Sequence, residues 1–553
     1  MSRGVLAPHV PAGPRLAVAI VAVAVAYHFS LATLASDWRY DTPLADLVLV
    51  PPIAAALLVA ASRRHRYVAF LRLGRFDLVL AGMFAAAALG LVAAGPALWS
   101  KYFWAMRIDL LTLPFFTAAA IVLLFGARAL VPLAFPIGFL LLAWPLPYLA
   151  LLERGLTAFT SATASAVERT ASLTHVATAV DGSGGSRYVV EHGGDQIVVS
   201  VASACSGVNA LIGFGVVGIA ALWLVRGRVV RRLAWLLAGG ALVWSLNVVR
   251  IVGVFLAARL LGEHAAFDLL HPVAGIVALN LAFVLLLWLL PLFGLERRRL
   301  DDFEVVDTPL ARTAVPAQQA TPWRIGPRLL LLVVLTGALA LADGQLGSAA
   351  KGLEESGRPA VAAFVDRPTA GAGWSVQRVE EIGWASPYYG RHSSWVRYRL
   401  RPTGQLAARG RFTVWTDAVL SPDLGALNAF TLAHCYAFHG FHVDVSRRVD
   451  LGDGVIGQLF VYRTSRTVWH ALAWQWPVLR GGKVEHERIV LLANTETHPR
   501  MTAGARSSWL TEHMLQYLNA HERNHDPNVA LSHSLAALAA EMVSTRIDRK
   551  ART

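Results

Sequence analysis

Long apolar runs separated by short basic loops fill most of the first 300 residues of the chain. A helix that crosses a bilayer needs roughly 20 consecutive apolar residues. Windows near that length fall at about 15–35, 43–61, 76–98, 108–126, 129–151, 207–225, 233–260 and 272–294, and a weaker one at about 328–344. The pattern predicts a polytopic α-helical membrane protein with about eight core spans and a ninth.

The pattern changes beyond about residue 345, where short stretches alternate between apolar and polar residues, as at 394–400, 411–415, 457–462 and 470–476. This alternation is typical of strands. Two helices are expected near the end, at 507–521 and from about Asn528. The sequence therefore predicts a soluble β-rich or α+β domain, and we divide the chain into a membrane domain (1–298), a linker (299–327), an additional span (328–344) and an accessory domain (345–553).

Composition supports the membrane interpretation, because 55% hydrophobic and 16% charged residues are unusual for a soluble globular chain. The formal charge of +14 would suggest nucleic-acid binding in a soluble protein. Here much of the arginine lies in short loops between apolar runs, so topology explains it better. The first apolar stretch is too long for the core of a signal peptide, and we interpret it as a retained first span.

The arginine-rich loops also predict the orientation, since short basic connections stay in the cytoplasm. Every such loop follows an even-numbered span. This regularity places the N-terminus inside, and the 152–206 connection and everything after about residue 345 outside. The arginines are Arg63, Arg64, Arg66, Arg72 and Arg75 after the second span, Arg226, Arg228, Arg231 and Arg232 after the sixth, and Arg297, Arg298 and Arg299 after the eighth.

The 152–206 connection is expected to begin with a helix at 156–174 and to continue as a β-hairpin. Two segments of β-forming residues, from Arg187 and from Asp195, flank the pair Gly193-Gly194. The second strand of this hairpin runs toward Cys205, at the start of the sixth span. The hairpin would therefore deliver a thiol to the outer membrane boundary.

Three reactive groups are predicted to meet at that boundary: Cys205, Arg250 and His271. Each has a plain alternative, since a cysteine can be a small buried residue, an arginine near a helix end can snorkel to the interface, and an interfacial histidine is often structural. Their equal depth in three successive segments favours a shared site. Asn247 lies three residues before Arg250 and so shares its helix face.

A thiol, an imidazole and a guanidinium are the groups that a cysteine acyl-transfer enzyme needs. His271 would accept the thiol proton and return it to the leaving amine, while Arg250 would hold the oxyanion. Asp268 and Glu263 are both candidates to orient His271. The sequence predicts no cofactor and no metal at this site, and the two cysteines are expected to be free thiols.

Three motifs in order carry a resemblance to a known family. They are Ala204-Cys205-Ser206-Gly207, Asn247-x-x-Arg250-Ile251 and His271-x-x-x-Gly275, preceded by Phe135-Pro136, Ala143-Trp144-Pro145-Leu146-Pro147 and the hairpin. Together they resemble the exosortase and archaeosortase family over roughly residues 15 to 295. The resemblance implies Cys205 as nucleophile, His271 as general base and acid, and Arg250 as transition-state stabiliser. Ser206, Gly207 and Asn247 would support the site or the substrate.

The same resemblance implies a transpeptidase or protease of the bacterial inner membrane. Its partners would be exported proteins with a C-terminal sorting signal, made of a motif such as Pro-Glu-Pro, a transmembrane helix and a basic tail. Membrane lipids and the machinery of exopolysaccharide production are further implied partners, and nucleic acid is not. One position departs from the family pattern, because Asn209 stands where many relatives carry arginine, which bears on specificity for the signal.

Two alternatives stay open from the residues alone. A non-enzymatic membrane component of polysaccharide or lipid export would use Arg250 to line a polar path. In the C-terminal domain, Cys435 lies close to His434, His439 and His442, which allows a metal or second catalytic site, although the spacing matches no standard zinc pattern. The C-terminal domain otherwise loosely resembles the small periplasmic partner domain found beside exosortases.

Overall fold

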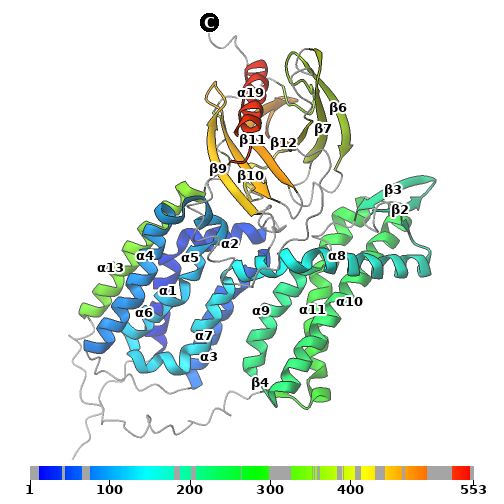
Figure 1. Ribbon diagram of the computed structural model, residues 1–553. Coiled ribbons are helices and arrows are strands. Elements are labelled where there is room, and N and C mark those ends of the chain that lie inside the picture. The colour runs from blue at the N-terminus through cyan, green and yellow to red at the C-terminus, as the bar shows by residue number, and fades with distance from the viewer. Residues whose placement is uncertain are drawn as a thin grey trace, which may run out of the picture.

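The computed structural model describes residues 12–39, 44–64, 75–179, 187–200, 207–262, 264–297, 326–350, 353, 355–357, 362–382, 389, 392–404, 413–429, 432, 442–463, 467–494 and 526–547. A helical region forms the larger part, and an antiparallel β-sheet domain follows it (Figure 1). The predicted fold class is therefore confirmed.

The helical region contains two groups of helices. The first includes α1 (Ala12–Ala26), α2 (His28–Arg39), η1 (Ala45–Leu49), α3 (Val50–Arg64), α4 (Arg75–Met106), α5 (Ile108–Leu111), α6 (Leu113–Phe125), η2 (Ala127–Ala129), α7 (Leu130–Phe139) and η3 (Leu140–Ala143). The second includes α8 (Leu146–Thr174), α9 (Val208–Leu224), α10 (Val229–Leu261), the π-helical η5 (Ala265–Leu270), α11 (His271–Leu289) and η6 (Leu290–Phe293), with β4 (Val225–Arg226) pairing with β5 (Glu296–Arg297).

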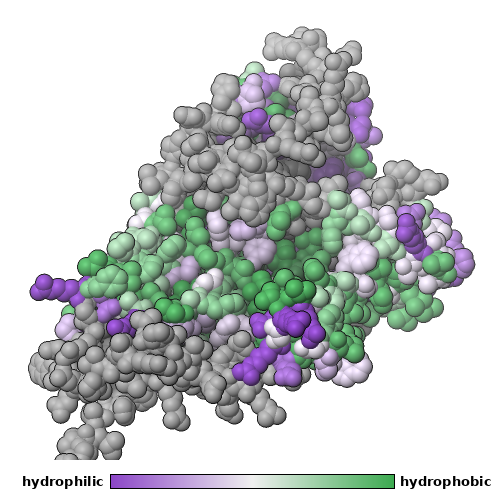
Figure 2. All heavy atoms as spheres, turned by 60° about the horizontal axis from the view of Figure 1, so that its bottom comes forward, coloured by the Kyte–Doolittle hydropathy of each residue, from purple (hydrophilic) through white to green (hydrophobic). Residues whose placement is uncertain are grey.

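Among the described residues, six helices are long and apolar enough to cross a membrane, or seven if the bent pair α1 and α2 counts as one span. Two expected spans are shorter apolar helices, Ala127–Ala143 and Val208–Leu224. Hydrophobic residues cover much of the helical region's surface in Figure 2, and its exposed side chains include Val131, Leu237 and Trp288. This exposure suits contact with lipid and makes the chain a multi-pass membrane protein.

The first expected span, 15–35, was wrong as a single helix. α1 and α2 meet at Tyr27 with a bend of 78°. The amides of Phe29 and Ser30 donate to Asp343 Oδ2, at 2.7 and 3.2 Å, instead of to carbonyls of the preceding turn. Asp343 belongs to α13 (Gly326–Ala350), the ninth expected span, which packs against α1, α2 and α4.

The fifth expected span, 129–151, also ends differently. Its helix stops at Ala143, because Trp144 has an extended backbone (ψ 118°) immediately before Pro145. A residue before proline avoids the helical conformation. α8 then begins at Leu146, ten residues before the helix that the sequence predicted at 156–174. Figure 1 shows α8 lying across the end of the α9–α11 group that also carries the hairpin.

The predicted hairpin is confirmed with its turn. β2 (Arg187–His192) pairs with β3 (Asp195–Ser200), and β1 (Thr178–Ala179) adds a short third strand. Gly193 and Gly194 connect the strands with φ angles of 58° and 96°. A two-residue turn with both φ angles positive matches the right-handed twist of the strands, and glycine adopts it without strain.

The C-terminal domain is a seven-stranded antiparallel sheet in the order β6-β7-β8-β12-β11-β10-β9. Its strands are β6 (Trp374–Glu381), β7 (Ser394–Pro402), β8 (Val414–Ser421), β9 (His442–Asp450), β10 (Ile456–Arg463), β11 (Val468–Arg480) and β12 (Lys483–Ala493), with α16 (Leu424–Ala429) and α19 (Val529–Arg546). Four of these strands and α19 were predicted. The helix expected at 507–521, Cys435 with His434 and His439, and the linker up to residue 325 lie outside the described residues, while His442 is the first residue of β9.

α19 covers one face of the sheet and packs on β11 and β12. Asn528 caps its N-terminus by accepting the amide of Leu531 at 3.0 Å. Just before the cap, Asp526 Oδ1 lies 3.0 Å from His470 Nε2 on β11, and Asp526 Oδ2 accepts the Ser532 hydroxyl at 2.6 Å. One carboxylate thus ties the start of α19 to the sheet.

Candidate active site

The hairpin and α8 are fastened to α10, the helix that carries Arg250. The Tyr188 hydroxyl donates to Ala164 O at 3.1 Å, and its ring lies 5.1 Å from that of Phe255. The Trp244 indole donates to Thr163 Oγ1 at 3.0 Å. Burial, with the charge of Glu168, raises the pKa of Tyr188 to about 12, so this phenol stays a neutral donor.

At the turn of the hairpin, His192 Nδ1 lies 2.7 Å from Arg259 O, near the end of α10. The hairpin is thus held at both of its ends, by Tyr188 and by His192. β3 ends at Ser200, five positions before Cys205. These contacts hold the hairpin on α8 and α10, and its predicted course toward Cys205 stays a prediction. Cys205 and Ser206 themselves lie outside the described residues.

Gly207 is the first described residue after them, and it precedes α9 with φ 90° and ψ 7°. A Cβ atom placed on Gly207 would lie 2.7 Å from Asn247 Nδ2 and 2.9 Å from Asn247 Cγ. A side chain at position 207 is therefore unfavourable for two reasons. The backbone is in the left-handed region, which favours glycine, and a Cβ atom would collide with Asn247. The buried Asn247 side chain, 3% exposed, packs directly on the backbone that follows Cys205.

Arg250 lies between Asn247 and α11. Its Nη1 donates to Asn247 Oδ1 at 3.3 Å, one turn earlier on the same helix. On its other side, a Cβ atom on Gly275 would lie 3.6 Å from Arg250 Cζ and 3.8 Å from Nε and Nη1. Glycine at 275 lets the guanidinium lie close to the α11 backbone. The structure thus brings together Gly207, Asn247, Arg250 and Gly275 from three helices.

His271 is the first residue of α11, one turn before Gly275. The structure describes its backbone but not its side chain. The π-helical turn η5 leads into it, in place of the open loop that the sequence suggested at 261–270. Such turns often occur at functional sites. Asp268 lies within η5, and Glu263 falls outside the described residues. Because Cys205 lies outside the described residues, the contact of thiol and imidazole stays a prediction.

One neighbouring carboxylate was missed in the sequence. Asp46, in η1, packs on Gly213 of α9, where an added Cβ would lie 2.7 Å from Asp46 Cγ. Asn209 lies one turn before Gly213 on the same side of α9, and its buried Oδ1 has no hydrogen-bond partner among the described residues. Asp46 falls inside the apolar window 43–61, and an ionisable residue in such a window marks a functional candidate. That signal was available in the sequence.

The described part of the chain contains no group of three or more histidine, cysteine, aspartate or glutamate residues placed to hold a metal ion. The candidate site on α9, α10 and α11 is built instead from an amide, a guanidinium and two glycines. A fixed cation beside a buried amide suits stabilisation of a developing negative charge.

Comparison with known proteins gives one match. Residues 38–288 match the family model described as transmembrane exosortase (Exosortase EpsH). The match runs from the end of α2 to the last turn of α11 and so includes every candidate site residue. No curated protein and no solved structure matches the chain. The C-terminal sheet domain lies beyond the match, and its resemblance to a partner domain stays a prediction. Residues 38–288 of this multi-pass membrane protein belong to the transmembrane exosortase family.

Proposed function

We propose that the protein is a membrane-embedded cysteine protease or transpeptidase that cleaves C-terminal sorting signals of exported proteins at the outer face of the membrane. The observation that carries the proposal is the placement of Arg250 between Asn247 and Gly275, beside the backbone that leads to Cys205 and one turn from His271. Family membership of residues 38–288 supports it.

In this mechanism the Cys205 thiol passes its proton to His271, and the thiolate attacks the scissile carbonyl. The tetrahedral oxyanion then forms next to the Arg250 guanidinium, whose charge persists throughout. Collapse of this intermediate breaks the C–N bond, and His271 returns the proton to the leaving amine. The acyl group remains on sulfur as a thioester until water or an acceptor amine or hydroxyl attacks it and releases the thiol.

Asn247 acts as a positioning residue in this scheme. Its Oδ1 accepts from Arg250, and its amide packs on Gly207, so a single buried side chain relates the guanidinium to the segment that carries the thiol. The hydrogen bond to the buried Asn247 side chain restricts the rotamers of Arg250 before substrate binds. Preorganised donors of this kind act without reorganisation during the reaction.

The proposal includes a setting and partners. The protein would lie in the bacterial inner membrane with its N-terminus in the cytoplasm and the accessory domain 345–553 in the periplasm. Substrates would carry a Pro-Glu-Pro type motif, a transmembrane helix and a basic tail, in connection with exopolysaccharide production. The sheet domain follows α13 at the end of the helical region where α8 and the hairpin lie (Figure 1). That location suits an accessory role near the site.

The test follows an exported protein with such a tail in cells that contain wild-type protein, Cys205→Ala or Cys435→Ala, and reads its size on a gel. We expect loss of processing with Cys205→Ala and normal processing with Cys435→Ala. Cys435→Ala is the matched control because it removes the only other thiol of the chain. Normal processing with Cys205→Ala would refute the thiol mechanism and favour a non-enzymatic export component.

A further inference from the structure

Three arginines lie together where α10 begins, at the end of the helical region that carries β4 and β5. Arg228 is the N-cap residue of α10, and Arg231 and Arg232 follow in its first turn. Positions three and four apart bring side chains on a helix close to one another. Arg228 and Arg231 are exposed, and Arg232 is half-buried. Figure 2 shows hydrophilic residues gathered among hydrophobic ones at this end of the helical region.

These three guanidiniums have no anionic partner in the part of the chain that the structure describes. None of them forms a side-chain hydrogen bond or ion pair there, and the buried Nε of Arg232 is without an acceptor. Glu296 is the only acidic residue in the stretches 221–236 and 286–297, and it lies opposite Arg226 in the β4–β5 pair. Like charges at these spacings repel one another, and the positive end of the helix dipole lies at the same place. An anion bound there would offset this repulsion.

The backbone that carries the arginines is held in place by the neighbouring helices. The Trp235 indole donates to Leu286 O at 3.0 Å and so joins α10 to α11. Leu295 is buried and packs on Gly227, where an added Cβ would collide with it. On the other side, a Cβ atom on Gly294 would lie 2.6 Å from Arg231 Nη1, so this guanidinium lies against the turn that follows η6. The cations are therefore presented by a preformed surface.

The apolar side chains around the arginines indicate which kind of anion fits. Val230 is 76% exposed in the same turn of α10, and Leu292, just before Gly294, is 79% exposed. Exposed apolar side chains at the start of a membrane span suit contact with acyl chains. A phospholipid with an acidic headgroup supplies a phosphate for the guanidiniums and hydrocarbon for Val230 and Leu292. A free phosphate supplies only the first of these.

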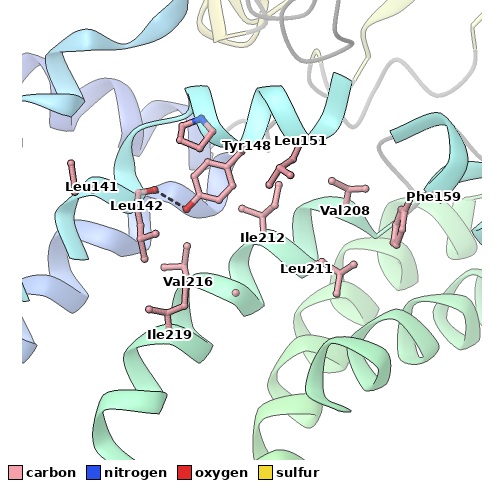
Figure 3. Close-up of a pocket in the computed structure, with 12 residues that line it drawn as sticks. Leu141, Leu142, Tyr148, Leu151, Phe159, Val208, Leu211, Ile212, Val216 and Ile219 are labelled. Atoms are coloured by element: carbon pink, nitrogen blue, oxygen red, sulfur yellow. Dashed lines mark hydrogen bonds between the residues drawn. The ribbon is translucent and has the colours of Figure 1, made fainter. Parts of the chain in front are cut away.

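The apolar groove between α8 and α9, beside the first part of α9, lacks this combination (Figure 3). Its one side-chain hydroxyl, on Tyr148, donates to Leu142 O at 3.0 Å. No cationic side chain is among the described residues that line it. An acidic headgroup therefore finds its complement at the β4 end of the helices and not in this groove.

We propose that Arg228, Arg231 and Arg232 bind the phosphate of a glycerophospholipid whose headgroup carries a net negative charge. The lipid comes from the leaflet at this end, which is the cytoplasmic leaflet in the predicted orientation. The planar guanidinium matches the oxygens of a phosphate, and the start of α10, which has no side-chain cap, adds free amides. Binding does not require the proposed cleavage chemistry, so this inference goes beyond the proposed function.

The test titrates full-length protein in detergent micelles with dioleoyl phosphatidylglycerol or dioleoyl phosphatidylethanolamine and measures bound lipid by native mass spectrometry. We expect phosphatidylglycerol to bind at least about tenfold more tightly. The double variant Arg228→Gln, Arg231→Gln should weaken phosphatidylglycerol binding at least about tenfold, because charge-assisted hydrogen bonds are lost, and leave phosphatidylethanolamine binding unchanged. Arg75→Gln is the matched control, since Arg75 is an exposed arginine at the start of α4, on the same predicted side.

Arg231→Gln alone is a milder second variant with an expected loss of about fivefold, and gel filtration verifies that each variant remains folded. Equal phosphatidylglycerol affinity in the wild type and the folded variants would overturn the proposal. An equal loss in Arg75→Gln would do so as well, since the lipid would then respond only to overall positive charge. If glycerophosphoglycerol, the headgroup without acyl chains, competes as strongly as the whole lipid, the site takes a soluble anion and the lipid assignment is wrong. Cys205→Ala should bind phosphatidylglycerol like the wild type, so a failure of the proposed chemistry is distinguishable from a failure of the lipid site.

Discussion

Replacement of Asp343 by alanine is expected to destabilise the helical region strongly, because this carboxylate caps the N-terminus of α2 at the bend between α1 and α2. Asp343 is fully buried on α13. It accepts the amides of Phe29 and Ser30 at 2.7 and 3.2 Å, and the Ser30 hydroxyl as well. These amides are the free donors at the N-terminus of α2. A negative charge at that end of a helix is favourable in addition.

The magnitude follows from what Asp343→Ala leaves behind. Two backbone N–H groups would lose their partner in a buried place, and each such group costs about 1–3 kcal/mol. The expected loss is therefore about 2–6 kcal/mol of unfolding free energy. Arg107 lies nearby and retains its hydrogen bonds to Asp109, at 2.9–3.2 Å, so no buried cation is left without a carboxylate. Asp343→Asn keeps one oxygen acceptor and should lie between alanine and the wild type.

The assay is unfolding of the purified protein in mixed micelles by increasing sodium dodecyl sulfate, followed by circular dichroism. Leu341→Ala is the control, since Leu341 lies on the same helix with 73% of its side chain exposed. If Asp343→Ala lies within about 1 kcal/mol of Leu341→Ala, below the cost of one unpaired amide, the capping argument is refuted.

Two further predictions concern the site and the C-terminal domain. Gly207→Ala imposes φ 90° on alanine and displaces the Asn247 side chain. We expect a backbone strain of about 1–2 kcal/mol and at least a tenfold loss of substrate processing, read on a gel. The control is Gly90→Ala, which should process substrate normally because an added Cβ at Gly90 has no atom within 4 Å. Although burial acts in the opposite direction, hydrogen bonds from Ser532, His470 and the Asn528 amide hold the pKa of Asp526 below its ordinary value. Its stabilising contribution is therefore present above the usual carboxyl pKa of about 4 and is lost as the pH falls through the lower folded value. Thermal unfolding of full-length protein between pH 6 and pH 3 should show a weaker acid dependence in Asp526→Asn, and equal dependence would contradict this assignment.

The hairpin and most helices could be predicted because their signals are local. Alternating residues around Gly193-Gly194 determine both strands and the turn, and nearly every apolar window contains a helix in the structure. The bend at Tyr27 could not be found this way. Its cause is Asp343, which lies more than 300 residues later in the chain and contacts amides that an apolar window hides.

The missed strands have a physical explanation as well. β6 and β9 are the two edges of the sheet, and β6 is exposed or half-buried along its whole length. Their apolar/polar alternation is interrupted, at Arg378 in β6 and at Arg447 in β9, so each alternating run is short. β12 is central, but its first half contains Glu487 and Arg488, both of which are buried. Buried charges at inward positions interrupt the apolar pattern that marks a strand.

Three polar side chains of the helical region share one feature. Asn247 packs on Gly207, Arg250 on Gly275 and Asp46 on Gly213, each pair joining two different elements. In a membrane, a polar side chain needs both a partner and room between helices, and a small residue on the neighbouring helix provides the room. The glycines at 207, 213 and 275 are therefore as informative about this site as the polar residues, because each position reports where a neighbouring polar group lies.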